Sequence, residues 1–200
     1  MSEVNPSSKV LTIPNLLTFL RIALIPVFAI LLVYHREGWA LIVFTIAGVS
    51  DGIDGFVARR LNQESELGTI IDPIADKLLI TTAFVMLTLP SIIGTDRPHL
   101  PVPFWVTATV IGRDVAIVAI AGAINVMTGF RGFKPSWLGK ASTFVQVVGV
   151  MLILIAAVFP ANNGLFLPTT YTVVAAFAFF SGIHYIFHVA RLMKNEDNHS

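Results

Sequence analysis

Long apolar stretches separated by short polar connections run through the whole chain. A helix that crosses a bilayer needs about 20 mostly apolar residues, and six segments meet that length. We predict spans at about residues 14–34, 39–61, 70–93, 102–125, 139–159 and 168–192. The pattern therefore predicts an all-α polytopic membrane protein with six transmembrane helices, built as a single membrane domain over residues 1–200.

Composition supports the membrane class and excludes several kinds of site. The 200 residues are 55% hydrophobic and only 12% charged, whereas soluble proteins carry about 25% charged residues. There is no cysteine, which excludes disulfides and thiolate metal sites. The net charge of +1 gives no indication of nucleic-acid binding, so we expect no such partner. No signal-peptide arrangement is expected, because the first apolar run begins near Ile13 after a polar, nearly uncharged stretch.

Basic residues are divided unevenly between the two sides that six spans define. One side holds both termini and the second and fourth connections. Eleven basic residues lie on or near that side: Lys9, Arg21, Arg59, Arg60, Lys77, Arg113, Arg131, Lys134, Lys140, Arg191 and Lys194. The other side holds only Arg36 and Arg97. Because cytoplasmic segments carry an excess of Lys and Arg, we expect both termini to be cytoplasmic, in a bacterial-type inner (plasma) membrane.

Four aspartates lie in the second and third predicted spans: Asp51, Asp54, Asp72 and Asp76. Carboxylates at membrane depth are costly, and residues three or four apart share one face of a helix. The connection over residues 62–68 is short, so we expect the two helices to be antiparallel neighbours whose four carboxylates face one another. Two Mg²⁺ or Mn²⁺ ions would neutralise them and leave positions for phosphate oxygens.

Small and basic residues accompany the aspartates. Gly55, Ala58 and Gly68 leave space along the same face, and Arg59 is placed to bind a phosphate. Residues of these kinds are individually often packing or capping residues, but their combination favours a phosphate-binding site. We also expect the third helix to begin only a few residues before Pro73, because proline is tolerated in a first turn.

Residues 51 to 76 follow the pattern D-x2-D-G-x2-A-R-x8-G-x3-D-x3-D without a gap. This pattern resembles the signature of the CDP-alcohol phosphotransferases, and the chain length and six-span layout resemble that family as well. The resemblance implies transfer of a substituted phosphate from a CDP-linked donor to an alcohol, with release of CMP, two divalent cations and a homodimer. The residues it implicates are Asp51, Asp54, Asp72 and Asp76 as metal ligands, Asp76 also as the catalytic base, and Gly55, Ala58, Arg59 and Gly68 around the cytidine diphosphate.

Two further segments, one opening the first span and one leading into the fifth, resemble the glycerophosphate and cardiolipin branch of that family. The candidate residues for binding an anionic acceptor are Asn15, Thr18, Arg21, Arg113, Lys134 and Lys140. A helix start and a topology signal explain the first three about as well, and attraction to lipid headgroups explains the two lysines about as well.

The resemblance implies a CDP-diacylglycerol-dependent phosphatidyltransferase at the cytoplasmic interface, with membrane lipid as its partner. We favour glycerol 3-phosphate as the acceptor, giving phosphatidylglycerophosphate. Phosphatidylglycerol is the alternative acceptor, because Arg113-Asp114 is nearer to cardiolipin synthases of the eukaryotic type.

A cation transporter is an alternative from another class, although every clustered acid falls in one hairpin rather than in paired repeats. His184 and His188 are four apart, yet hydrogen bonding within the bundle is favoured over a zinc site.

Overall fold

A computed structural model describes residues 13–61, 66–94, 100–128, 137–159 and 164–197. Within these ranges, only the backbone is described at residues 13–15, 51–61, 66–70, 127–128, 188 and 191–197. The helices are α1 (Ile13–Val33), α2 (Glu37–Leu61), α3 (Glu66–Thr88), the short α4 (Pro90–Ile93), α5 (Phe104–Thr128), α6 (Trp137–Val158) and α7 (Phe166–Asp197). The described part of the chain contains no strand, which confirms the all-α prediction.

Four of these helices are long and apolar enough to cross a membrane. The candidate spans are Leu16–Val33, Phe104–Val126, Trp137–Val158 and Phe166–Phe187. The described apolar stretch of α2 is shorter, Glu37–Ser50, and α3 carries Asp72, Asp76 and Lys77 within its length. These helices are consistent with an integral membrane protein, while the six spans and the cytoplasmic termini stay predictions.

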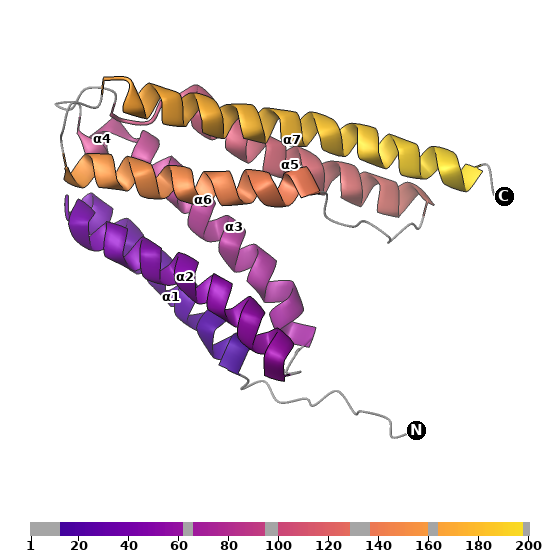
Figure 1. Cartoon of the computed structure of the whole chain (residues 1–200), viewed down its shortest axis with the longest axis horizontal. Helices are drawn as coiled ribbons and strands as arrows, with labels where there is room; N and C mark the ends of the chain where they lie inside the picture. The colour runs from indigo at the N-terminus through magenta and orange to yellow at the C-terminus, as the bar shows by residue number, and fades with distance from the viewer. Residues whose placement is uncertain (1–12, 62–65, 95–99, 129–136, 160–163, 198–200) are drawn as a thin grey trace.

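The helices form two groups that pack against each other. In Figure 1, α5, α6 and α7 lie together in the upper part of the view, and α1 and α2 lie below them at an angle. α1 packs against both α2 and α3, and α7 packs against both α5 and α6. α2 contacts α6, and α3 contacts α5 and α6, so both groups meet around α3 and α6.

One continuous apolar core joins the two groups. Phe28 of α1 and Phe44 of α2 are fully buried, with ring centroids 5.7 Å apart, and the same cluster includes Phe84 of α3 and Ile153 of α6. Lipid tails are as apolar as these side chains, so close packing rather than escape from water holds such helices together. Gly48 of α2 faces Val147 of α6, and a Cβ added to it would make an ordinary van der Waals contact with Val147 Cγ1 at 3.9 Å.

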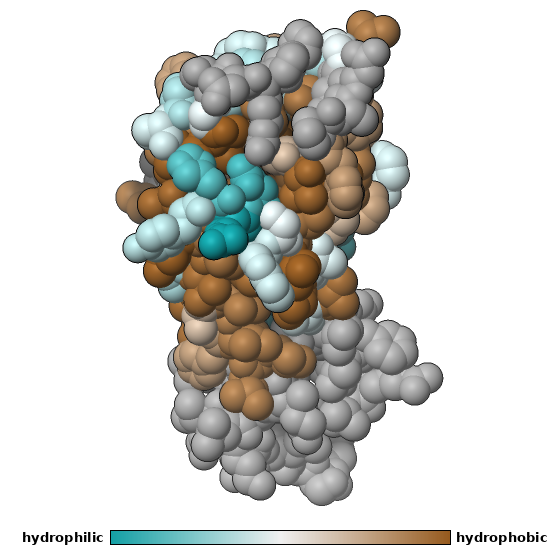
Figure 2. Space-filling view, turned by 90° about the vertical axis from the view of Figure 1, so that its left-hand side faces the viewer, coloured by the Kyte–Doolittle hydropathy of each residue, from teal (hydrophilic) through white to brown (hydrophobic). Residues whose placement is uncertain are grey.

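The outer surface of the bundle is also largely apolar. Figure 2 shows one end of the molecule, where polar residues gather in a limited patch surrounded by apolar surface. Val118 and Val126 of α5 are 72% and 85% exposed. Exposed apolar side chains on this scale match a chain that is surrounded by lipid.

Two prolines change the expected boundaries of the third span. α3 begins at Glu66, so Pro73 is its eighth residue, and the prediction that it lies in the first turn is wrong. Proline has no N–H to donate to the carbonyl of residue 69, a loss that transmembrane helices tolerate when neighbours cover the gap. The predicted span 70–93 also contains two helices, because Pro90 starts α4 as its first residue, after Leu89.

Candidate functional site

Two aspartates on α3 bond to polar residues on α1. Asp72 accepts a hydrogen bond from the Thr18 hydroxyl, and Asp76 forms an ion pair with Arg21, at 2.8 Å between Oδ1 and Nη1. Thr18 and Arg21 are three residues apart, and Asp72 and Asp76 are four apart, so the two contacts lie on successive turns of both helices. They hold one face of α1 against the acidic face of α3.

Arg21 connects three helices at this point. Its side chain is 1% exposed, and its Nε donates to the Ala47 carbonyl of α2 at 3.4 Å. A charge buried this deeply needs a partner of opposite charge, and the Asp76 carboxylate provides one. The carboxyl group of Asp76 is 30% exposed, so it can reach a ligand while it is paired.

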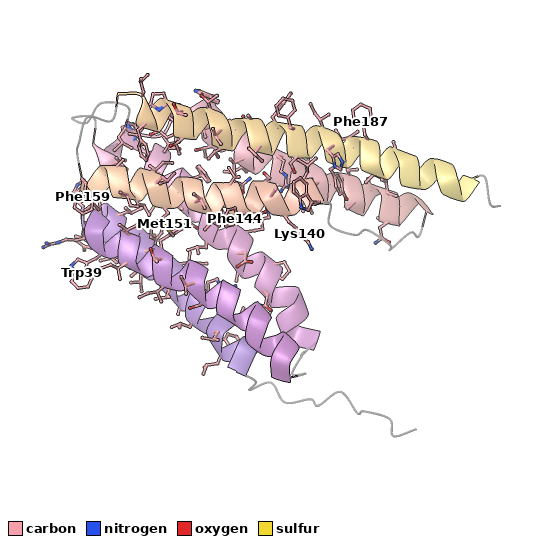
Figure 3. The ribbon with its side chains drawn as sticks, viewed as in Figure 1. Trp39, Lys140, Phe144, Met151, Phe159 and Phe187 are labelled. Atoms are coloured by element: carbon pink, nitrogen blue, oxygen red, sulfur yellow. The ribbon has the colours of Figure 1, made fainter. Side chains whose placement is uncertain are left out.

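Asp76 faces a pocket of about 510 Å³ between α2, α3 and α6. Lys140 and Thr143 of α6 also line this pocket. The rest of its wall is largely apolar and includes Phe44, Ala47 and Gly48 of α2 together with Leu79, Ile80, Phe144 and Val147. Figure 3 shows Lys140 near the start of α6, with Phe144 one turn further along the helix. A pocket with charged groups and apolar walls matches a ligand that has a charged head and a hydrocarbon part.

A second polar cluster, the Arg113 cluster (Lys77, Arg113, Asp114 and Ser181), joins α3, α5 and α7. Asp114 Oδ1 lies 2.6 Å from Lys77 Nζ and 2.6 Å from Arg113 Nη1. Arg113 Nη2 donates to Ser181 Oγ at 2.7 Å and lies 3.5 Å from the Gly139 carbonyl. One carboxylate between two cations leaves an excess positive charge.

One nitrogen of this cluster is a buried donor without a partner among the described residues. Arg113 is 9% exposed, and its Nε is buried with no hydrogen-bond partner among the described residues. A buried donor without a partner is costly, and protein atoms enclose this nitrogen, so it is the excess positive charge of the cluster that favours an anion nearby. Lys77 directly follows Asp76 on α3, so the cluster adjoins the acidic face.

The structure brings some predicted site residues together and leaves others undescribed. Asp72, Asp76, Thr18 and Arg21 meet at the α1–α3 contact, Lys140 lines the Asp76 pocket, and Arg113 belongs to its own cluster. The side chains of Asn15, Asp51, Asp54, Gly55, Ala58, Arg59, Gly68 and His188, and the whole of Lys134, lie outside the described residues. Of these residues, positions 51 to 59 lie on the backbone of α2 and Gly68 lies on that of α3. Only residues 62–65 separate the two helices.

It therefore stays a prediction that the four aspartate carboxylates of α2 and α3 face one another. Within the described part of the chain, no three acidic or imidazole side chains gather as a metal site. Thr18 and Arg21, predicted to bind an acceptor, contact the carboxylates of α3, and their role towards an acceptor also stays a prediction. His184 has an interaction partner in the structure.

Two α7 residues beside Arg113, Ser181 and Gly182, were not expected from the sequence. Lys77 was counted among the basic residues that indicate topology, some of which could serve a site instead, and its position next to Asp76 was a usable signal. Ser181 and Gly182 had no signal beyond being small residues in an apolar helix. Ser181 bonds Arg113 Nη2 and so helps to position the guanidinium, whereas Gly182 lies beside the aliphatic part of the same side chain, where an added Cβ would be 3.4 Å from Cγ.

Comparison with known proteins places the chain in a family. Residues 11–190 match the model of the CDP-alcohol phosphatidyltransferase family, and the chain belongs to this family. It is 36% identical over 149 residues to the CDP-diacylglycerol–glycerol-3-phosphate 3-phosphatidyltransferase of Escherichia coli strain K12, covering 71% of this chain and 76% of that protein.

Cardiolipin synthases are similar to about the same degree. The chain is 35% identical over 156 residues to the CMP-forming cardiolipin synthase of Streptomyces coelicolor, covering 75% of this chain and 68% of that protein. It is 34% identical over 203 residues to the human CMP-forming cardiolipin synthase, covering 92% of this chain and 64% of that protein. The enzyme prediction is thus confirmed, the transporter alternative has no support, and the two acceptor types are not separated.

Proposed function

We propose that the protein transfers the phosphatidyl group of CDP-diacylglycerol to the hydroxyl of an anionic alcohol and releases CMP. The observation that carries this proposal is the Asp76 pocket, where a partly exposed carboxylate and Lys140 stand among apolar walls. A lipid with a diphosphate head combines the two properties that such a pocket recognises. The family membership supports a CDP-linked donor.

The donor chemistry of the aspartates fits divalent cations. Mg²⁺ and Mn²⁺ prefer carboxylate oxygens, and Asp72 and Asp76 present theirs on successive turns of α3, with Asp51 and Asp54 of α2 as the further ligands we propose. When bound, two such ions offset the diphosphate charge and polarise the phosphorus centre. Thr18 and Arg21 each bond to Oδ1 of one aspartate, which fixes the orientation of both carboxylates.

Asp76 is the proposed base. It takes the proton of the acceptor hydroxyl, and the hydroxyl oxygen forms a bond to the phosphorus that carries diacylglycerol. The bond from that phosphorus to the CMP oxygen breaks in line, and CMP leaves with the electron pair. Gly55, Ala58, Arg59 and Gly68 line the cytidine diphosphate in this proposal, and Arg21 offsets the charge of Asp76 before the proton arrives.

The excess positive charge of the Arg113 cluster supports an acceptor that carries a phosphate. Glycerol 3-phosphate is the acceptor that the sequence favours. Phosphatidylglycerol is a second candidate, because cardiolipin synthases are among the similar proteins. Lys134 and Lys140 are proposed to assist in binding either acceptor, together with Asn15.

The membrane location, the topology and the oligomeric state are also part of the proposal. We infer an integral protein of a bacterial-type inner membrane, with six spans, both termini and the site on the cytoplasmic side, and a homodimer as the working assembly. The excess of basic residues beside the termini and the second and fourth connections supports this orientation.

An acceptor panel tests the proposal. Purified protein in liposomes with CDP-diacylglycerol and Mg²⁺ or Mn²⁺ is offered glycerol 3-phosphate, phosphatidylglycerol, inositol phosphate or serine separately, and the lipid products are identified by mass. We expect CMP release and a product with glycerol 3-phosphate or phosphatidylglycerol, and none with serine, which carries no phosphate. Absence of CMP release with all four acceptors would reject the function.

A further inference from the structure

A second pocket, of about 540 Å³, shares one lining residue with the Asp76 pocket. Its walls come from α6 and α7, and Phe144 lines both pockets. The Phe144 side chain is 69% exposed, and because it lines both pockets it lies where two spaces of similar volume adjoin. Here the space on the α6–α7 side of Phe144 is called the α6–α7 pocket.

The α6–α7 pocket suits a hydrocarbon chain. Its polar lining residues are Thr169 and Thr170. Their hydroxyls donate to the carbonyls of Leu165, at 2.7 Å, and Phe166, at 2.9 Å. Each hydroxyl therefore uses its only hydrogen within its own helix, and the lining side chains have no donor left for a polar ligand.

The α6–α7 pocket leads away from the charged end of the site. Along α6 it extends from Phe144 to Leu152, which is about 12 Å at the helical rise, and Lys140 lies one turn before Phe144. In Figure 3, Lys140, Phe144, Met151 and Phe159 follow one another along α6 in that direction. Gly149 lies in the pocket wall, where a Cβ would come within 2.5 Å of Val174 Cγ2, so α6 and α7 approach closely there.

We propose that the two acyl chains of the CDP-diacylglycerol donor separate at Phe144, one entering the Asp76 pocket and the other the α6–α7 pocket. This inference rests on the proposed function and adds how the lipid part of the donor is held. A diacyl lipid whose diphosphate is fixed at Asp76 has two chains that start from one point, and the structure offers two spaces with largely apolar walls that share one lining residue, Phe144.

The acyl chains of the donor are directed to the pockets by their attachment to the bound head group rather than by the hydrophobic effect. Within a bilayer, a hydrocarbon chain gains little from hydrophobicity when it leaves other chains for an apolar pocket, so any gain in binding comes from close packing against the pocket walls. A head group bound at Asp76 makes the entry of each chain an intramolecular event, which raises its effective concentration at the pockets. The α6–α7 pocket therefore selects a second chain by its position and shape.

The acceptor is a less suitable occupant of the α6–α7 pocket. The cations of the Arg113 cluster proposed to attract its phosphate, Arg113 and Lys77, line neither pocket, nor does Ser181, which bonds Arg113. On α7, Ser181 lies seven residues beyond Val174, the last lining residue, which is about 10 Å along the helix. The lysine that does adjoin Phe144 is Lys140, and it shares the Asp76 pocket with the proposed base.

A binding experiment tests the proposal without turnover. Val148→Phe and Val173→Phe, alone and combined, place bulk at the α6–α7 pocket, while Val126→Phe is the same change on α5, where the side chain is 85% exposed. Binding of CDP-diacylglycerol and of its single-chain analogue is measured with Mn²⁺ and no acceptor, as the rise in melting temperature over ligand concentration. Melting without ligand shows whether each variant folds.

Wild type and Val126→Phe should bind the two-chain donor about tenfold more tightly than the one-chain donor, and the combined pocket variant should lose this difference. In the CMP-release assay, the KM for CDP-diacylglycerol should rise by the same factor and the KM for the acceptor should not change. Equal donor binding by the combined variant and Val126→Phe would overturn the proposal. A rise confined to the KM of a lipid acceptor would also overturn it, by assigning the pocket to the acceptor.

The experiments distinguish failure of the proposed function from failure of the acyl-chain proposal. If the wild-type protein binds CDP-diacylglycerol but releases no CMP with any acceptor, the proposed function is rejected. Comparing the binding of the two-chain and one-chain donors would still decide whether the α6–α7 pocket holds an acyl chain. Wild type that binds neither donor would overturn both.

Discussion

Arg21 is the least exposed charged side chain among the described residues, at 1%. It bonds to Asp76 of α3 and to the Ala47 carbonyl of α2, so one guanidinium fixes the carboxylate proposed as the base relative to two neighbouring helices. Removing one partner of a buried ion pair costs more than the pair itself contributes, because the other charge stays behind. The residue therefore matters both for the fold and for the chemistry.

Replacement of Arg21 by Met should lower both stability and activity. Loss of the pair to Asp76 is expected to cost about 3 kcal/mol of unfolding free energy and to reduce CMP release about hundredfold, with Arg21→Lys in between because it keeps the charge. Thermal unfolding in detergent and the CMP assay measure the two effects. Arg36→Met, on an exposed arginine in the α1–α2 turn, is the control. Equal behaviour of the Arg21 and Arg36 variants would contradict the assignment.

Ser181 has a narrower role at the same scale. Ser181→Ala removes the oxygen that accepts from Arg113 Nη2 at 2.7 Å, and a hydrogen bond to a charged group contributes about 1.5–3 kcal/mol. Because Arg113 is proposed to bind the acceptor phosphate, the KM for the acceptor should rise about tenfold, while the KM for CDP-diacylglycerol should not change. Steady-state kinetics with each substrate varied in turn separate these effects. Ser142→Ala, equally buried on α6, should leave both KM values unchanged, and a matching rise there would refute the role of Ser181.

At the scale of elements, a close approach between α6 and α7 occurs at a glycine. Gly149 faces Val174 so closely that a Cβ would lie 2.5 Å from Val174 Cγ2. Contacts of this kind are typical of helix pairs in membranes, where small residues let backbones approach. The two helices also form the α6–α7 pocket, so their spacing affects the site as well as stability.

Gly149→Ala should force α6 and α7 apart. We expect a loss of about 1–3 kcal/mol of unfolding free energy, as for overpacked cores, measured by thermal unfolding in detergent. Gly122→Ala on α5 is the matched control, since a Cβ added there would meet nothing within 4 Å, and better helix propensity should make it neutral or slightly stabilising. A Gly149 variant as stable as the Gly122 variant would show that the close contact is absent.

The helices themselves were largely predictable from the apolar pattern, because span length and polar connections are local properties. α1 and α2 begin and end within about two residues of the predicted spans 14–34 and 39–61. The third span was predicted less well. The pattern did not show that α3 continues through Pro73 from Glu66, nor that Pro90 starts a separate helix, because neighbouring helices decide whether a proline interrupts a membrane helix.

At the scale of the whole molecule, function depends on contacts between the two groups of helices. The spacing of Asp72 and Asp76 predicted that they share a face, and the structure agrees. The sequence could not show that Thr18 and Arg21 contact that face, or that Phe144 of α6 lines two pockets. These relations join residues far apart in the chain, and no local periodicity records them.

The orientation prediction also belongs to the whole molecule. The chain has no cysteine, so single cysteines can be introduced at Arg36, in the α1–α2 turn, and at Trp137, which is 79% exposed at the start of α6. A membrane-impermeant maleimide should modify Arg36→Cys in intact cells and Trp137→Cys only after permeabilisation, because basic residues favour the cytoplasm. The reverse labelling pattern would place the site on the outer side.

The most direct test of the central claim is the rate of CMP release from CDP-diacylglycerol by Asp76→Asn. The variant keeps the shape of the side chain and removes the proton acceptor and a proposed metal ligand, so the rate should fall about 10³-fold or more while melting shows a folded protein. Glu37→Gln, at the start of α2, makes the same chemical change away from the site and should release CMP at the wild-type rate. An Asp76→Asn protein that releases CMP as fast as wild type would contradict the account.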